Sequence, residues 1–312
     1  MDPLRPLPVD LANFIGYLFE TESLAPASLR VARAAVSSTI KQLGGPSFSD
    51  HPLLHDLMRA ASLRAARSPV RVPAWDLFVV LRYLRAPPFE PLAGLSLRDL
   101  TLKTVFLVSL ASGRRCSEVH AFSGLPHDIA LEPDGSMSLR FLPDFLAKNQ
   151  DPSAQAPVVS IPSLTSVLDE QDEDRYLCPV RALRRYLRMT RHFRGAKRRL
   201  FISWNSECLC DIRKSSIARW LTDTIKAAYA ALAPSTSVLS PKAHEIRAWS
   251  ASLAFAQTRD LRAVLDAAYW RSPATFIQHY LRDVARLRED GSLGIASAVV
   301  AQRVVGSSSS SL

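Results

Sequence analysis

Two short stretches of the sequence place arginine next to acidic or imidazole side chains at helical spacing. The segment GRRCSE at 113–118 directly follows an apolar run, and HEIR occupies 244–247. An arginine at a helix junction, with a carboxylate three residues on, can be held rigidly for a bidentate phosphate contact. In the second stretch His244 and Arg247 share one helix side, where they can neutralise charge and handle a proton. An ordinary surface ion pair and a structural helix remain the alternatives for these stretches.

Three further residues gain meaning only from their order along the chain. Lys148 lies in an expected loop, and Trp270 and Tyr280 lie near the C-terminus. A loop lysine is usually solvated, and aromatic residues beside an apolar stripe usually belong to the core. The order Arg, Lys, HxxR, Trp, Tyr is what makes them candidates for one site.

The composition narrows the classes of protein. The chain has 312 residues with 39 Lys+Arg against 29 Asp+Glu, a formal net charge of +10 that favours a polyanionic partner. No run approaches the ~18 apolar residues of a membrane span, and the N-terminus lacks a secretion-signal layout. Four cysteines form neither a disulfide framework nor a zinc motif, so we expect a reducing intracellular compartment. No glycine-rich nucleotide motif occurs, and we expect neither a cofactor nor a metal.

Hydrophobic periodicity predicts a mainly helical chain with a small antiparallel β-sheet. Turn signals and a basic stretch at 65–72 indicate a linker, and the Ser-rich tail is typical of a disordered segment. We therefore expect a helical domain at 1–68, a larger domain at 69–290 and a C-terminal segment at 291–312. The expected helices cover 11–19, with Asp10 as N-cap, then 26–43, 54–61, 75–84, 97–111, 180–186, 215–232, 243–255, 261–268 and 273–287. The expected strands cover 129–131, 136–142 and 158–161.

Together, over roughly residues 73–290, these features resemble the tyrosine recombinase, or phage-type integrase, family. In that family an arginine follows a glycine at a helix junction, and a lysine lies on a β-hairpin loop. An HxxR motif begins a helix, and a histidine or tryptophan precedes a tyrosine nucleophile. The resemblance implies a catalytic domain of that fold behind an N-terminal core-binding domain. The matching residues here are Arg115, Lys148, His244, Arg247, Trp270 and Tyr280.

The resemblance implies a DNA transesterification without metal. Tyr280 attacks a DNA phosphate, which gives a 3′-phosphotyrosyl bond and a free 5′-hydroxyl. Arg115 and Arg247 neutralise the phosphate oxygens, and Trp270 donates its indole N–H to them. His244 takes the tyrosine proton or orients the phosphate.

Two assignments around this set concern neighbouring residues. Lys148 protonates the leaving oxygen from a loop that closes on bound DNA. Glu118 orients Arg115 from three positions away, with a simple helix ion pair as the alternative. Arg114 competes with Arg115 for the phosphate contact, and the family spacing G-x-R-x-S-E favours Arg115.

Finer motif text resembles the recombinases of DIRS-type and related eukaryotic mobile elements. It comprises LCPVRAL at 177–183, AHEIR at 243–247 and the W-R-S-x-x-T-F-x-x-x-Y run at 270–280. This resemblance implies double-stranded DNA as partner, a homotetramer on DNA, no membrane, and a nuclear location in a eukaryote. The family has one helix more before the first expected here, so a truncated or domesticated copy also fits.

Three alternatives to an active recombinase stay open at this point. One is a catalytically silent DNA-binding remnant of a mobile element. Another is a helical protein-interaction module whose motifs match by chance. The last is a type IB topoisomerase, which uses similar chemistry. The basic run at 181–199 fits either contact with DNA or a nuclear import signal.

Overall fold

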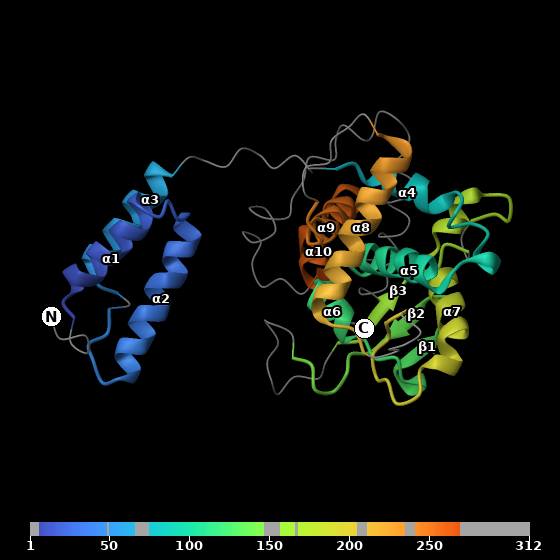
Figure 1. Ribbon diagram of the computed structural model, residues 1–312, viewed down its shortest axis with the longest axis horizontal. Coiled ribbons are helices and arrows are strands. Elements are labelled where there is room, and N and C mark those ends of the chain that lie inside the picture. Colours follow the sequence, from blue (N-terminus) through green and yellow to red (C-terminus); the bar gives the residue numbers. More distant parts are fainter. Residues whose placement is uncertain are drawn as a thin grey trace. The chain divides into compact units, whose positions relative to one another are not determined.

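The computed structural model describes residues 6–48, 50–65, 75–146, 157–165, 168–204, 211–234 and 241–268. By its internal contacts the chain divides into two compact units, Met1–Arg71 and Val72–Leu312. Each unit has its own hydrophobic core. Figure 1 shows both units.

The first unit is a bundle of three helices. They are α1 (Pro8–Glu20), α2 (Pro26–Gln42) and α3 (Pro52–Arg64), and each begins with proline. Proline suits this position because its missing N–H has no acceptor in the first turn. The helices bury a shared apolar core that includes Leu11, Ile15, Leu29 and Leu54.

The predicted cap of the first helix is wrong in its position. The helix begins at Pro8, and Asp10 is its third residue rather than its N-cap. Its carboxylate accepts the backbone N–H of Leu7 at 2.8 Å. An acid in the first turn stabilises the exposed N–H end of a helix from either position, so the residue type alone does not fix the boundary.

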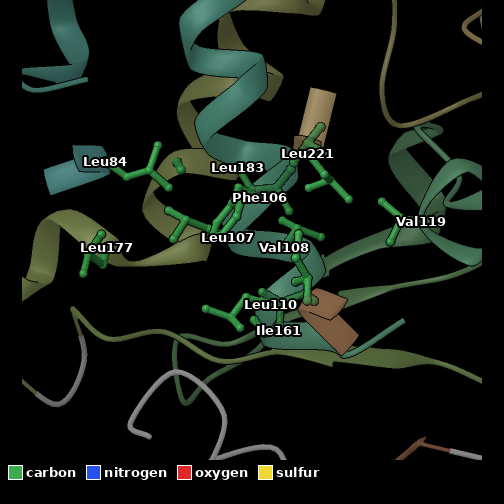
Figure 2. Packing of buried hydrophobic residues seen from close by; sticks show 14 of the residues in the cluster. Leu84, Phe106, Leu107, Val108, Leu110, Val119, Ile161, Leu177, Leu183 and Leu221 are labelled. Atoms are coloured by element: carbon green, nitrogen blue, oxygen red, sulfur yellow. The ribbon is translucent and has the colours of Figure 1, made fainter. Parts of the chain in front are cut away.

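The second unit is built around a buried helix, α5 (Leu97–Ser112). Every α5 residue from Leu100 to Ser112 is buried. Figure 2 shows Phe106, Leu107, Val108 and Leu110 of this helix inside the packed cluster. The helices α7, α8 and α9 all contact α5, as Figure 1 also shows. The other helices of this unit are α4 (Leu77–Arg85), α6 (Cys116–Ala121), α7 (Pro179–Thr190), α8 (Lys214–Leu232), α9 (Glu245–Thr258) and α10 (Leu261–Ala268).

Both ends of α5 are set by local chemistry. The Ser96 hydroxyl accepts the Asp99 backbone N–H at 3.1 Å and donates to its carboxylate at 2.7 Å. At the other end Gly113 has a φ of 55°, the left-handed conformation that terminates a helix and favours glycine. The chain therefore turns sharply there, and α6 starts three residues later.

A small antiparallel sheet packs near the same core. Its strands are β1 (Ile129–Leu131), β2 (Met137–Leu139) and β3 (Val159–Ile161), in the order β1-β2-β3. Strand β2 pairs Met137 with Ile161 and Leu139 with Val159 of β3, which contacts α5. The prediction of a mainly helical fold with a small antiparallel sheet is confirmed, whereas the expected helix at 273–287 lies outside the described residues. Within the described ranges, no helix has the length and apolar character to cross a membrane.

Candidate active site

Arg115 stands at the junction between α5 and α6, where it is the N-cap residue of α6. Its backbone N–H donates to Glu118 Oε2 at 2.8 Å, and its Nη1 donates to Glu118 Oε1 at 3.0 Å. Its side chain is 27% exposed. One guanidinium edge is thus held by Glu118 while the group remains open to solvent.

Arg247 reaches the same carboxylate from α9, more than a hundred residues along the chain. Its Nη1 donates to Gly113 O at 3.0 Å and lies 3.4 Å from Glu118 Oε2. Its side chain is only 2% exposed. The guanidinium therefore joins α9 to the C-terminal end of α5.

Glu118 is the group that brings the two arginines together. Its side chain is 4% exposed, and its two oxygens face both guanidinium groups. A buried charge of this kind requires opposite charge and hydrogen bonds nearby. Two guanidinium groups against one carboxylate leave a formal charge of +1, which suits an anionic group such as a phosphodiester.

The two consecutive arginines after Gly113 have different surroundings. Arg114 is buried, with its guanidinium 6.0 Å from the centre of the Phe141 ring. Phe141 in turn stacks on Phe122. Arg115, not its neighbour, shares Glu118 with Arg247.

The HEIR segment starts a helix, although its two basic residues differ in exposure. His244 is the N-cap residue of α9 and is exposed, whereas Arg247 is buried. Between them Glu245 accepts the Trp75 indole N–H at 2.9 Å and the Lys242 backbone N–H at 3.1 Å. His244, at the start of the motif, is therefore in contact with solvent, whereas Arg247, at its end, is shielded from it.

Trp75 and Glu245 hold the start of α9 in place, and sequence reasoning did not single them out. Trp75 is 2% exposed, and its ring lies 6.1 Å from that of Trp249 in α9. Glu245 carries a detectable signal, since an acid in a first helical turn commonly accepts backbone N–H groups. Trp75 carries none, because the two partners are 170 residues apart.

A cavity of about 430 Å³ opens beside α6. Ile212 O lies 2.7 Å from His120 Nε2, so this nitrogen carries the proton, because a carbonyl only accepts. Burial lowers the pKa of His120, and Arg199 donates to the His120 carbonyl at 3.0 Å. The lining residues are Ser117, His120, Leu142, Asp144, Phe145, Leu146, Arg199 and Lys214.

The structure brings part of the predicted site together. Arg115, Glu118 and Arg247 meet, and His244 begins the helix that carries Arg247. Lys148, Trp270 and Tyr280 lie outside the described residues. Across the described ranges, no group of three or more His, Cys, Asp and Glu side chains has the arrangement of a metal site.

Comparison with known proteins places the fold. No protein-family model and no curated protein sequence matches the chain. A solved structure, the XerH site-specific recombinase bound to its palindromic difH substrate in a post-cleavage complex, superposes with a TM-score of 0.57. That match has 15% identity and covers 91% of this chain and 71% of XerH. The chain has the tyrosine recombinase fold. XerA recombinase also aligns, with a TM-score of 0.44, 16% identity and coverage of 93% of this chain and 83% of XerA.

In this chain the tyrosine recombinase fold accounts for the position of the arginine cluster. The glycine that ends α5 and the first residues of α9 come together across the core of the second unit. Gly113 and Arg247 are 134 residues apart in the sequence. The packing of α9 on α5 therefore brings Arg247 to Gly113 and Glu118, which the spacing of the motifs does not show.

Proposed function

We propose that the chain is a tyrosine-type DNA recombinase that cleaves and rejoins double-stranded DNA through a 3′-phosphotyrosyl intermediate. The observation that carries the proposal is the shared contact of Arg115 and Arg247 with Glu118. The fold supports it, because XerH, which has a similar fold, is a site-specific recombinase bound to its substrate after cleavage.

The arginine cluster has the charge that this reaction requires. As a nucleophile adds to a phosphodiester, negative charge builds up on the non-bridging oxygens. Two guanidinium groups fixed by one carboxylate meet that charge without having to reorganise. They supply the positive charge that Mg²⁺ supplies at other phosphoryl-transfer sites, so the proposed reaction needs no metal.

In the proposed reaction the Tyr280 phenol oxygen bonds to phosphorus as the bond to the 5′ oxygen breaks. The phenolic proton passes to His244, and Lys148 donates a proton to the leaving 5′ oxygen. Trp270 donates its indole N–H to a non-bridging phosphate oxygen. The phosphotyrosyl bond keeps the energy of the phosphodiester, so attack by another 5′-hydroxyl reverses the step.

The proposal extends to the biological setting through motif text. We propose that the chain derives from a DIRS-type or related eukaryotic mobile element and acts in the nucleus. We further propose that four copies bring two duplexes together, with both units contacting DNA. The positive net charge of +10 supports a salt-dependent affinity for DNA.

The test is covalent trapping on a nicked suicide substrate. The full chain is incubated in EDTA with a pool of nicked duplexes of random sequence, and adducts that survive detergent are separated by electrophoresis. Wild-type protein forms an adduct, and Tyr280→Phe forms none because the attacking oxygen is missing.

A matched tyrosine provides the control. Tyr176 is 39% exposed in the 3₁₀ turn Glu173–Leu177, and Tyr176→Phe keeps the adduct. Wild-type protein that binds the pool and forms no adduct contradicts the proposal and favours a silent DNA-binding remnant. Relaxation of supercoiled plasmid without strand exchange favours a topoisomerase instead.

A further inference from the structure

The segment 179–204 is strongly basic. It contains nine Lys and Arg residues and no Asp or Glu. Helix α7 forms its first half and buries Ala182, Leu183, Tyr186 and Thr190. Its remaining sides therefore carry positive charge with no acid of the same segment to balance it.

Several of these cations are used inside the protein. Arg181 binds both oxygens of Glu90, at 2.6 and 2.9 Å, and Arg185 donates to Ala93 O at 2.9 Å. Arg194 donates to the carbonyls of Arg199 and Leu200 at 3.1 and 2.8 Å. These arginines stabilise the fold, and their charge is not available to a partner in full.

Three others form an exposed row, here called the α7 arginine face: Arg184 and Arg188 of α7, and Arg191, which directly follows its last residue. Their spacing of four and three residues places them on one side, with rises of about 6 and 4.5 Å along the axis. Among the described residues, none of their guanidinium groups has a hydrogen-bond or ion-pair partner. The row is therefore free to bind an anion.

The α7 arginine face lies apart from the arginine cluster around Glu118. Helix α5 contacts both α7 and α9 and lies between them in Figure 1. The start of α7 is joined through Arg181 and Glu90 to Lys103 in the first half of α5. Helix α5 therefore separates a ligand on the α7 arginine face from a phosphate held by Arg115 and Arg247.

We propose that the α7 arginine face binds the sugar–phosphate backbone of a second DNA segment without reading its sequence. DNA presents a regular series of negative charges, which matches a regular row of solvated cations. A specific acidic protein partner needs a desolvated apolar anchor at its centre. The apolar residue between Arg184 and Arg188 on α7 is Leu187, and it packs against the core instead of offering such an anchor. The proposal goes beyond the proposed cleavage reaction and does not depend on it.

The experiment titrates the full chain with a fluorescent 24-base-pair duplex of random sequence, in EDTA and at several salt concentrations. Wild-type protein shows two binding phases, and the weaker one has a salt slope of about −2.7, since each phosphate contact contributes about −0.9. The variant Arg184→Gln/Arg188→Gln/Arg191→Gln loses the weaker phase and keeps the stronger one. Exposed side chains are exchanged, so its melting temperature stays that of wild type.

Two control variants separate this row from net charge. Arg98→Gln/Lys226→Gln/Arg259→Gln removes the same charge from exposed positions on three other elements and keeps both phases. Replacement of Arg184, Arg188 and Arg191 by lysine restores the weaker phase. A titration in which the α7 glutamine variant keeps both phases overturns the proposal.

Further arms identify the partner class and the relation to cleavage. Loss of binding to poly-glutamate by the α7 variant, with both DNA phases kept, also overturns the proposal and indicates an acidic protein partner. When the three α7 glutamine substitutions are added to Tyr280→Phe protein, loss of the weaker DNA phase supports the proposal. That last result stands even where no covalent adduct forms, so failure of the cleavage reaction and failure of this surface are distinguishable.

Discussion

Two buried carboxylates of the second unit, Glu118 and Glu90, each hold two cations. Glu118 binds Arg115 and Arg247, and Glu90 binds Lys103 and Arg181. In each cluster one cation is almost fully buried and the other is between a quarter and a third exposed. Formal charge gives +1 for both. Charge and exposure alone therefore do not separate a binding site from a structural one.

The two clusters differ in how many donors remain unused. Arg181 commits both Nη atoms to Glu90, and its guanidinium lies 5.2 Å from the centre of the Tyr176 ring. Lys103 donates to Glu90 at 2.5 Å and to two backbone carbonyls. Arg115 commits only Nη1, and its other N–H groups have no partner within the described residues. Spare donors on a partly exposed guanidinium are therefore present in the proposed phosphate site and absent from the Glu90 cluster.

A second difference is whether the charge is permanent. Burial and the neighbouring Arg181 lower the pKa of Lys103 to about 8, against the opposing effect of Glu90. Hydrogen bonds from Arg181 and Lys103 hold the pKa of Glu90 below its ordinary value despite burial. Guanidinium groups keep their charge, so the Glu118 cluster stays cationic where the Glu90 cluster can lose a proton. A cavity of about 750 Å³ lies beside Arg181 and Glu90.

The largest expected effect separates the two clusters by activity. Arg115→Ala and Arg247→Ala each lower the rate of adduct formation by roughly 10² to 10³, because a charge that meets the transition state is lost. Arg181→Ala leaves the rate per folded molecule within about threefold. The rates are measured on the nicked substrate at 10 °C, with the folded fraction taken from circular dichroism. Equal losses in all three variants break the comparison.

The next largest expected effect concerns the contribution of the Glu90 cluster to stability. Lys103→Met lowers the free energy of unfolding by about 3 kcal/mol, since two carbonyls lose a donor and Glu90 loses one counter-charge. Arg98→Met, at an exposed position, changes it by less than about 0.5 kcal/mol. Urea titration followed by circular dichroism measures both. A Lys103→Met protein as stable as wild type shows that the Glu90 cluster is not structural.

The smallest effect concerns pH. The pKa of Lys103 is about 8 in the folded chain, against 10.5 for an unperturbed lysine, so between these values only the unfolded chain holds the proton. Stability from this residue therefore rises with pH, by about 1.4 kcal/mol per unit between pH 8 and 10. The measurement is the difference between wild type and Lys103→Met in urea titrations at each pH. A difference that is constant from pH 8 to 10 contradicts the lowered pKa.

Local signals predicted most of the helices and the sheet. Ser96, Gly113 and the alternation of apolar residues at 136–142 are short-range features whose physics acts within a few residues. The error at the first helix arose within the same range, because proline and an acid both favour a helix start. The pairing of Arg115 with Glu118 was predictable for the same reason, since three residues separate them.

Contacts that join distant parts of the chain could not be predicted from the sequence. The sequence nominated Arg247 through HxxR, yet its contact with Gly113 depends on how α9 packs on α5. The Trp75–Glu245 and Lys103–Glu90–Arg181 contacts carried no motif at all. A buried lysine and an exposed one look alike in a sequence, because burial is a property of the packed core.

By itself the sequence determined which segments form helices, where these helices end and which residue types are available for chemistry. Those outcomes follow from backbone preferences and hydrogen bonds that close within one turn. Only the tertiary structure decided that two guanidinium groups meet on one buried carboxylate while a second carboxylate serves the core. Burial removes water from Lys103 and Arg247 and leaves Arg115 and Arg181 partly solvated. This difference in solvation exists only once the helices have packed.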